Sequence, residues 1–316
     1  MTTYVVRRLL LMVPTLLLVS VMVFLIMRLI PGDVVSLMFQ DLGYAQSLAE
    51  MRARLGLDLP LHQQYLRWMG QLLRADLGES LWTQRGVVSV LAERLPVTLE
   101  LSLLAIAFSV AYGGATGVIA AICQDRPADV TLRSLAMAFL SLPTFWLGTL
   151  AIVFPSLWLG WSPSIQLVPL AADPLGHLAQ FALPAGILGS HLGAPVMRLT
   201  RAMLLDAFRQ DYVRTAWAKG LEARRVILKH ALRNAVIPTV TIIGVQVSQA
   251  FAGSVVLETL FGLPGMGSLL VEAVAHRDFP MFQSLVLCLA LFVMAVNLAV
   301  DLLCVVIDPR LRVHPG

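Results

Sequence analysis

A basic segment between two apolar stretches has the clearest potential for interaction chemistry in this sequence. Residues 198–233 carry nine of the 23 Lys and Arg residues. Apolar spacing predicts one helix over Leu204 to Trp217 and a second over Glu222 to Leu232, with a break at Gly220. Such a segment can present a surface to another protein, or it can bind the anionic lipids of a membrane. The basic residues are Arg198, Arg201, Arg209, Arg214, Lys219, Arg224, Arg225, Lys229 and Arg233.

Other polar residues beside apolar stretches are weaker candidates. Glu258 leads into a turn-rich segment containing Phe261 and Pro264, which we interpret as part of an external gate. His191 lies inside an apolar stretch, where a lone histidine is more typical of packing or hydrogen bonding than of a ligand site. Four ionisable residues lie near the ends of apolar stretches, where snorkelling or an interfacial partner is expected. These residues are Arg28, Glu100, Glu258 and Asp301.

Motifs for catalysis and for metal binding are missing from the sequence. There is no G-x-x-x-x-G-K-[ST] phosphate loop, and no H-E-x-x-H or G-x-S-x-G motif that would indicate an intramembrane enzyme. The cysteines Cys123, Cys288 and Cys304 lack metal-ligand spacing, so we interpret them as packing residues. We therefore expect no catalytic residue, no metal site and no cofactor bound by this chain.

The composition indicates an all-α integral membrane protein. The chain is 58% hydrophobic and only 13% charged, whereas a soluble domain has about 25% charged residues. A bilayer core requires roughly 20 apolar residues in a helix, and six stretches approach or reach that length. We therefore predict six transmembrane helices, within Leu9 to Met27, Leu101 to Cys123, Ser134 to Leu159, Leu178 to Met197, Ala235 to Leu257 and Phe279 to Val300.

The distribution of basic residues predicts the orientation. With the N-terminus inside, the two short outside loops, Gly160 to His177 and Glu258 to Asp278, hold only Arg277. The inside segments hold the nine residues named above together with Arg7, Arg8, Arg126, Arg133, Arg310 and Arg312. This asymmetry predicts that both termini are cytoplasmic. The first apolar stretch is too long for a cleaved signal peptide.

The spacing of the apolar stretches predicts an uneven domain organisation. We expect a first transmembrane helix over 1–30, an external helical region over 31–95, a five-helix core over 96–308 and a cytoplasmic tail over 309–316. Two amphipathic helices are predicted in the external region, over Leu48 to Leu55 and His62 to Leu73. This region, including Tyr65 and Trp68, is interpreted either as a docking surface for an external protein or as a structural cap.

Several motifs together resemble one transporter family. In the basic segment, Tyr212-Val213-Arg214-Thr215-Ala216 and Ala218-Lys219-Gly220 precede His230-Ala231-Leu232-Arg233-Asn234. Similar matches occur in order along the chain, and they are Leu55-Gly56-Leu57-Asp58, Arg94-Leu95-Pro96-Val97-Thr98, Ser141-Leu142-Pro143-Thr144, Pro264-Gly265-Met266-Gly267 and Asp308-Pro309-Arg310. The sequence is thus identified as resembling the permease subunit of bacterial ABC importers of the peptide/nickel, or dipeptide/oligopeptide, family.

The resemblance implies a multisubunit importer in the cytoplasmic (inner) membrane. A second, homologous permease, two ATPase subunits that hold ATP and Mg, and an extracytoplasmic substrate-binding protein are the implied partners, besides membrane lipid and without nucleic acid. It also implies a coupling loop over 198–234 that transmits movement from the ATPase. The implied ATPase-coupling residues are Tyr212, Val213, Arg214, Thr215, Ala216, Ala218, Lys219 and Gly220, with Arg214 standing where the general pattern has Glu.

The substrate class stays open at this point. By resemblance, the favoured substrates are di- or oligopeptides, and nickel or glutathione import within the same family is the alternative. A self-contained secondary transporter is the alternative from a different class, and it would require ionisable residues at mid-span and repeated halves. Only His191 fits the first requirement, and we find no internal repeat.

Overall fold

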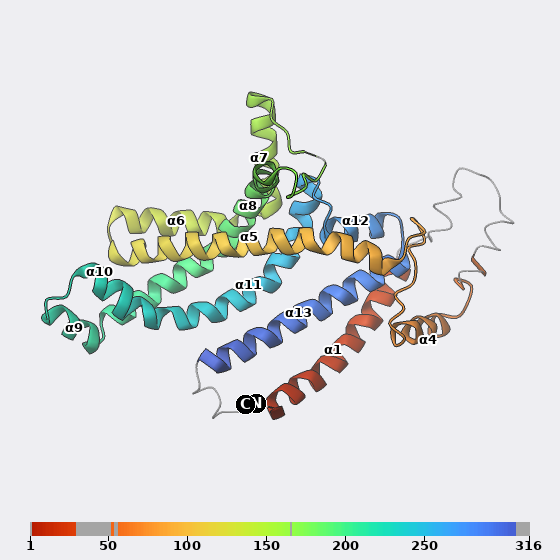
Figure 1. The fold of residues 1–316 in the computed structure, drawn as a ribbon, viewed down its shortest axis with the longest axis horizontal. Coiled ribbons are helices and arrows are strands. Elements are labelled where there is room, and N and C mark those ends of the chain that lie inside the picture. The colour runs from red at the N-terminus through yellow and green to blue at the C-terminus, as the bar shows by residue number, and fades with distance from the viewer. Residues whose placement is uncertain (1, 30–51, 54–55, 165, 308–316) are drawn as a thin grey trace. The chain divides into compact units, whose positions relative to one another are not determined.

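The computed structural model describes residues 2–29, 52–53, 56–164 and 166–307, which form helices joined by turns (Figure 1). Within these ranges there is no β-strand, only an isolated bridge between Glu79 and Gly86. The predicted all-α class is confirmed. The helices are α1 (Thr2–Leu29), α4 (Leu61–Leu72), α5 (Val87–Ile122), α6 (Pro127–Ser141), α7 (Thr144–Leu159), α8 (Pro174–Phe208), α9 (Asp211–Ala218), α10 (Ala223–Arg225), the π-helix η1 (Val226–Ala231), α11 (Leu232–Phe261), α12 (Met266–Ala275) and α13 (Phe279–Ile307).

The helices are distributed over two compact units, which we describe separately. The first unit comprises Met1–Pro96 and Ser268–Met294, and the second comprises Val97–Gly267 and Ala295–Gly316. Helices α5, α12 and α13 contribute residues to both units. The basic segment and Glu258 both belong to the second unit, whereas Tyr65 and Trp68 belong to the first.

The number of membrane spans depends on how two bent helix pairs are counted. Three helical stretches are long and apolar enough to cross a membrane, namely Val6–Leu29, Val87–Ile122 and Phe279–Leu302. Two pairs, Pro127–Ser141 with Thr144–Leu159 and Gly244–Phe261 with Met266–Ala275, qualify only together, as broken spans or re-entrant loops. The described residues therefore provide three to five candidate spans. The predicted number of six stays a prediction.

One predicted span is not a continuous helix. The stretch from Ser134 to Leu159 is divided between α6 and α7, whose axes differ by 99°. Leu142 at the break has extended backbone angles, with ψ at 131°. Pro143 explains this conformation, because a proline disfavours the helical region for the residue before it. The stretch is therefore two helices joined at a bend, and its role as one membrane span stays a prediction.

Close packing of α5 against α8 forms the centre of the second unit. Leu101, Phe181, Leu188 and Leu257 are buried in one cluster, which α5, α8 and α11 share. Glycine permits the close approach of the two helices, because a Cβ on Gly113 would lie 2.9 Å from the Cβ of Val196. Further contacts of this kind involve Gly117 with Thr200 and Gly189 with Phe108. Small residues at such crossings are typical of helices that pack in membranes.

In the first unit, α4 is attached to the end of α1. Tyr65 and Trp68 of α4 pack on Phe24 of α1, with ring centroids 5.2 and 6.1 Å apart. The Arg28 guanidinium donates to the side-chain oxygen of Gln64 at 2.8 Å. Helix α4 thus confirms the predicted helix over His62 to Leu73. The other predicted external helix, over Leu48 to Leu55, lies outside the described residues except for residues 52–53, and the predicted tail 309–316 lies wholly outside them.

Candidate functional site

Helix α9 is a short helix at the end of α8 (Figure 1). The predicted continuous helix from Leu204 to Trp217 is wrong, because α8 ends at Phe208 and Gln210 has an extended backbone with ψ at 145°. The turn at this point directs α9 back onto its own unit. Asp211 occupies the first turn of α9, where a negative charge interacts favourably with the helix dipole.

Two residues of α9, one helical turn apart, attach it to the rest of the second unit. Val213 is fully buried and Ala216 is 5% exposed, and both belong to a cluster with Leu204, Ala207 and Val226. The remaining residues of α9 are exposed. The side chains of Tyr212 and Trp217 are 41% and 47% exposed. Exposed aromatic side chains beside cations are typical of a surface that binds another protein. The exposed predicted residues are Tyr212, Arg214, Thr215, Ala218, Lys219 and Gly220.

Gly220 ends this helix in a left-handed conformation. Its φ is 74°, and a Cβ there would find no atom within 4 Å. The N–H of Gly220 donates to the carbonyl of Trp217 at 2.9 Å, and the N–H of Leu221 donates to that of Ala216 at 3.4 Å. This pair of hydrogen bonds is a Schellman motif, for which glycine is the preferred residue. The predicted break at Gly220 is confirmed.

The segment after Gly220 differs from its prediction. In place of one α-helix over Glu222 to Leu232, the chain forms the short α10 followed by the π-helix η1. A π-helix forms i→i+5 hydrogen bonds, so its wider turn brings residues five apart toward the same side. Val226 and Ala231 are five apart, and both are fully buried in the cluster that holds α9. The burial of both residues against α9 accounts for the wider turn.

Glu258 is buried at the bend between α11 and α12. It is completely inaccessible to solvent, and the two helices differ in direction by 72°. Its carboxylate accepts hydrogen bonds from the Thr98 hydroxyl at 2.8 Å and from the Gly267 N–H at 2.7 Å. The Thr98 hydroxyl oxygen also accepts from the N–H of Met266 at 2.7 Å. Glu258 and Thr98 therefore satisfy two N–H groups at the beginning of α12, which have no partner within that helix.

The other residues of the predicted gate differ in exposure. Phe261 is 2% exposed and packs in the core cluster of the second unit. Pro264 is partly buried, while Gly262 caps α11 with a φ of 67°. A Cβ on Gly265 would lie 2.7 Å from the Thr98 hydroxyl oxygen, so only glycine fits beside Glu258. The bend is therefore a packed structure rather than a free loop, and its role as a gate stays a prediction.

Tyr65 and Trp68 lie among residues of their own chain. Besides packing on Phe24, the Tyr65 hydroxyl is 2.9 Å from the Ser20 hydroxyl. Both aromatic side chains are partly buried. Their place in the structure is that of a support joining α4 to α1, and contact with an external protein stays a prediction for them.

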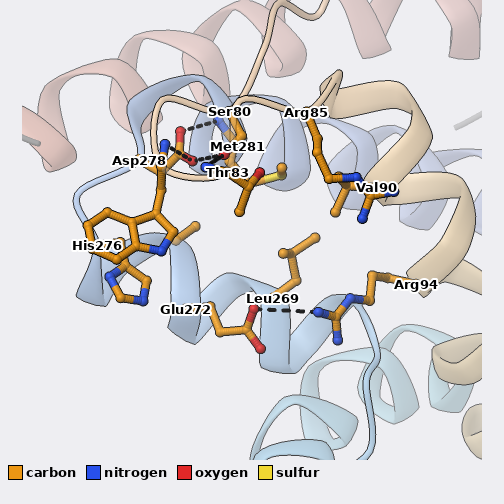
Figure 2. A pocket seen from close by; sticks show the side chains of 12 residues that line it. Ser80, Thr83, Arg85, Val90, Arg94, Leu269, Glu272, His276, Asp278 and Met281 are labelled. Carbon is orange, nitrogen blue, oxygen red and sulfur yellow. Dashed lines mark hydrogen bonds and ion pairs between the residues drawn. The ribbon is translucent and has the colours of Figure 1, made fainter.

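Sequence reasoning missed a cavity of about 190 Å³ in the first unit. Figure 2 shows Arg85 and Arg94 on one side of it, and Glu272 and His276 toward the other. Arg94 and Glu272 are 3.6 Å apart, and the His276 ring stacks on Trp82 at 4.0 Å. Beside it, the Asp278 carboxylate accepts a hydrogen bond from the Ser80 hydroxyl at 2.5 Å. The two sides lie nearly 200 residues apart in the chain, so no local motif indicates the cavity.

Two histidines of the second unit, His177 and His191, have structural partners. The Nδ1 of His191 is 3.1 Å from the Phe139 carbonyl, so the hydrogen-bonding role predicted for His191 is confirmed. His177 is buried, with Nδ1 at 2.6 Å from the Val168 carbonyl and Nε2 at 2.8 Å from a Glu100 carboxylate oxygen. The hydrogen bonds to Val168 and to Glu100 raise the pKa of His177, against the opposing effect of burial. Among the described residues, no group of three or more His, Cys, Asp or Glu side chains could hold a metal ion.

Comparison with known proteins identifies the family to which the chain belongs. Residues 113–313 match the family described as binding-protein-dependent transport system inner membrane component, and residues 1–102 match its N-terminal family. The chain is 40% identical to the di/tripeptide transport system permease protein DppB of Pseudomonas aeruginosa (strain UCBPP-PA14). It is 39% identical to the glutathione transport system permease protein GsiC of Escherichia coli (strain K12). In both comparisons, 99% of each chain is covered.

The fold comparison agrees with this assignment. A chain of the MetNI methionine ABC transporter, solved in inward-facing conformations, superposes with a TM-score of 0.57 at 16% identity, covering 70% of this chain and 97% of that one. The family match extends over most of the sequence, and the similarity to the two permeases extends over nearly all of it. The chain belongs to the family of binding-protein-dependent transport system inner membrane components, the multi-pass, non-enzymatic permease subunits of ABC importers.

Proposed function

We propose that this chain is one of the two pore-forming permeases of a peptide importer, and that α9 is its coupling helix. The division of α9 into a buried and an exposed side carries the proposal. Val213 and Ala216 fix the helix to the second unit, while the side chains of Tyr212, Arg214 and Trp217 are exposed. A partner that moves α9 would then also move the residues packed against it.

The arrangement of partners follows from this assignment. A second, homologous permease completes the pore, and each permease contacts one of two ATPase subunits, which hold ATP and Mg. The asymmetry of basic residues supports cytoplasmic termini and a position of α9 on the ATPase side of the membrane. A substrate-binding protein delivers the substrate from the other side. Transport then proceeds by alternating access between two conformations of the permease pair.

Relatives support peptides as the substrate. One relative is named for di/tripeptides and another for glutathione, which is itself a short peptide. We favour unmodified di- and oligopeptides, with glutathione as the second candidate. Uptake of a labelled dipeptide in competition with glutathione distinguishes the two, because a glutathione importer would lose dipeptide uptake at low glutathione concentration. Nickel import is the third possibility. It would appear as uptake of labelled nickel that neither the dipeptide nor glutathione inhibits.

The cavity of the first unit is a better candidate than Tyr65 and Trp68 for contact with the binding protein. Trp82 at its edge is 42% exposed, and the Arg85 and Glu272 side chains are each 51% exposed. Trp68 and Tyr65, by contrast, are engaged with α1. Trp82→Ala should therefore reduce stimulation of ATP hydrolysis by the binding protein more strongly than Leu66→Ala, which removes an exposed side chain of α4.

The coupling role is tested by the matched pair Trp217→Ala and Trp158→Ala. Both tryptophans are exposed, at 47% and 78%, but Trp158 lies on α7. The assembled transporter is purified through a tag on this permease, and the ATPase that copurifies is measured against the second permease. We expect a reduced ATPase content for Trp217→Ala only. Equal ATPase content in the two variants, at wild-type level, would contradict the proposal.

A further inference from the structure

A buried ion pair organises the side of the second unit where α6 meets α8. Asp129, in the first turn of α6, is completely inaccessible to solvent. It accepts two parallel hydrogen bonds from the Arg201 guanidinium of α8, from Nε at 2.8 Å and from Nη2 at 2.7 Å. The N–H of Asp125 donates a third at 3.0 Å. Bidentate pairing of this kind fixes the orientation of an arginine.

Two more arginines lie beside this pair with guanidiniums that are not fully engaged. Arg133 of α6 is 3.4 Å from Asp129, and its side chain is 45% exposed. Arg198 precedes Arg201 by one turn of α8, and it is exposed. The structure gives Arg198 no hydrogen bond or ion pair within the described residues. Asp129 is already occupied by Arg201, so Arg133 and Arg198 retain most of their capacity to bind an anion.

The three arginines line an open hollow of about 550 Å³ together with apolar side chains. No acidic residue is among its lining residues. Its apolar lining comes from α8 and α11, and it comprises Pro195, Leu199, Ala202 and Ile242. A ligand that fits this hollow carries a negative charge at one end and hydrocarbon at the other. Guanidinium groups suit phosphate oxygens because they can donate two parallel hydrogen bonds.

We propose that this hollow binds the phosphate headgroup of an anionic membrane phospholipid. The phosphodiester lies against Arg133 and Arg198, and the acyl chains continue along Leu199 and Ile242. Basic pockets between membrane helices are typical sites for such headgroups. A free phosphate ion would use the same arginines, but it would gain nothing from the apolar lining. The lipid and the free ion are therefore the two sources that an experiment must separate.

The test uses the complete transporter in detergent and native mass spectrometry. Dioleoyl-phosphatidylglycerol is titrated against dioleoyl-phosphatidylcholine for wild type, for Arg133→Gln/Arg198→Gln and for the control Arg126→Gln/Arg209→Gln. The control residues are exposed arginines that do not line the hollow. Arg201 is left unchanged, because its removal would take both charged hydrogen bonds from the buried Asp129 carboxylate and destabilise the protein itself.

We expect the Arg133/Arg198 variant to bind phosphatidylglycerol at least roughly tenfold more weakly, since each charge-assisted hydrogen bond contributes measurably to affinity. The control should retain wild-type affinity, and phosphatidylcholine should bind weakly to all three proteins. Equal losses in both double variants would overturn the site and indicate unspecific attraction to basic residues. Displacement of the lipid by inorganic phosphate at equal concentration would overturn the lipid as the ligand.

Discussion

Replacement of Gly220 separates two reasons why the turn after α9 requires glycine. The first reason is backbone strain, because φ is 74° at this position. For an L-residue the left-handed region costs about 1–2 kcal/mol. Alanine recovers about 0.4–1 kcal/mol of this through its smaller chain entropy in the unfolded state. We therefore expect Gly220→Ala to destabilise the turn by about 1 kcal/mol, which is a roughly fivefold change in the local equilibrium.

The second reason is steric. Within this chain there is room for a side chain at position 220, so any steric exclusion there would come from the partner. A Cβ on Gly220 meets no atom within 4 Å. Gly220→Asn should destabilise the turn less than Gly220→Ala, because asparagine tolerates left-handed backbone angles. Gly220→Trp adds bulk to the strain, and it should impair function further only where an ATPase surface closes over the turn. Gly186→Ala is the control, since it has the same open surroundings without a positive φ.

The assay is peptide uptake and ATP hydrolysis by the reconstituted transporter in proteoliposomes. We expect uptake per ATP hydrolysed to decrease in the order wild type, Asn, Ala, Trp, with Gly186→Ala at wild-type level. Wild-type coupling in Gly220→Ala together with failure of Gly220→Trp would refute the strain argument and leave only the steric one. Wild-type coupling in all variants would show that the turn has no part in transmission.

Three further predictions concern the second unit. Glu258→Gln should lower the free energy of unfolding by about 1–3 kcal/mol, because its N–H₂ group replaces one of the two carboxylate oxygens that accept from Thr98 and Gly267 and cannot itself accept a hydrogen bond; an unchanged melting temperature of the complex would contradict this. Gly113→Ala should cost about 1–3 kcal/mol by overpacking α5 against α8, whereas Gly114→Ala, with no atom within 4 Å of its Cβ, should be neutral in the same measurement. The pKa of His177 is raised in the folded state. Protonated His177 therefore contributes its full stabilisation below about pH 6.5, and this stabilisation is lost as the pH rises through the pKa of the folded state. His177→Gln should abolish this pH dependence in thermal unfolding followed from pH 5 to 8.

Local features of the fold were predictable because their causes are local. Apolar composition predicts helices, and Gly220 predicts a break, since each depends on residues within a few positions. Pro143 is a local signal that the interpretation of apolar composition did not use. The apolar run from Ser134 to Leu159 predicts one continuous helix, but the helix axis changes direction by 99° at Leu142 and Pro143.

Partnerships between distant residues were not predictable from one sequence. Glu258 was recognised as unusual, but its partner Thr98 is 160 positions away. The same holds for Asp129 with Arg201, at 72 positions, and for Ser80 with Asp278, at 198. The π-helix is a related case, because the burial of Val226 and Ala231 against α9 determines it. In each case, tertiary packing decides which polar or apolar group finds a partner.

Continuous packing within the second unit connects α9 with the bend at Glu258. Ala121 of α5 lies in the same cluster as Val213 of α9, and α5 then contacts α8 closely at its glycines. At its other end, α5 contributes Thr98 to the hydrogen bonds around Glu258. Packed interfaces of this kind move between discrete arrangements rather than deforming smoothly.

A displacement of α9 would therefore reach the bend mainly by moving α5 and α8 together. A double-mutant cycle between Gly113→Ala and Glu258→Gln, measured on uptake per ATP, tests this reasoning. Coupling between the two changes is expected because both act on the position of α5. Strict additivity would mean that the movement reaches the bend through α11, which links η1 to Glu258 directly along the chain.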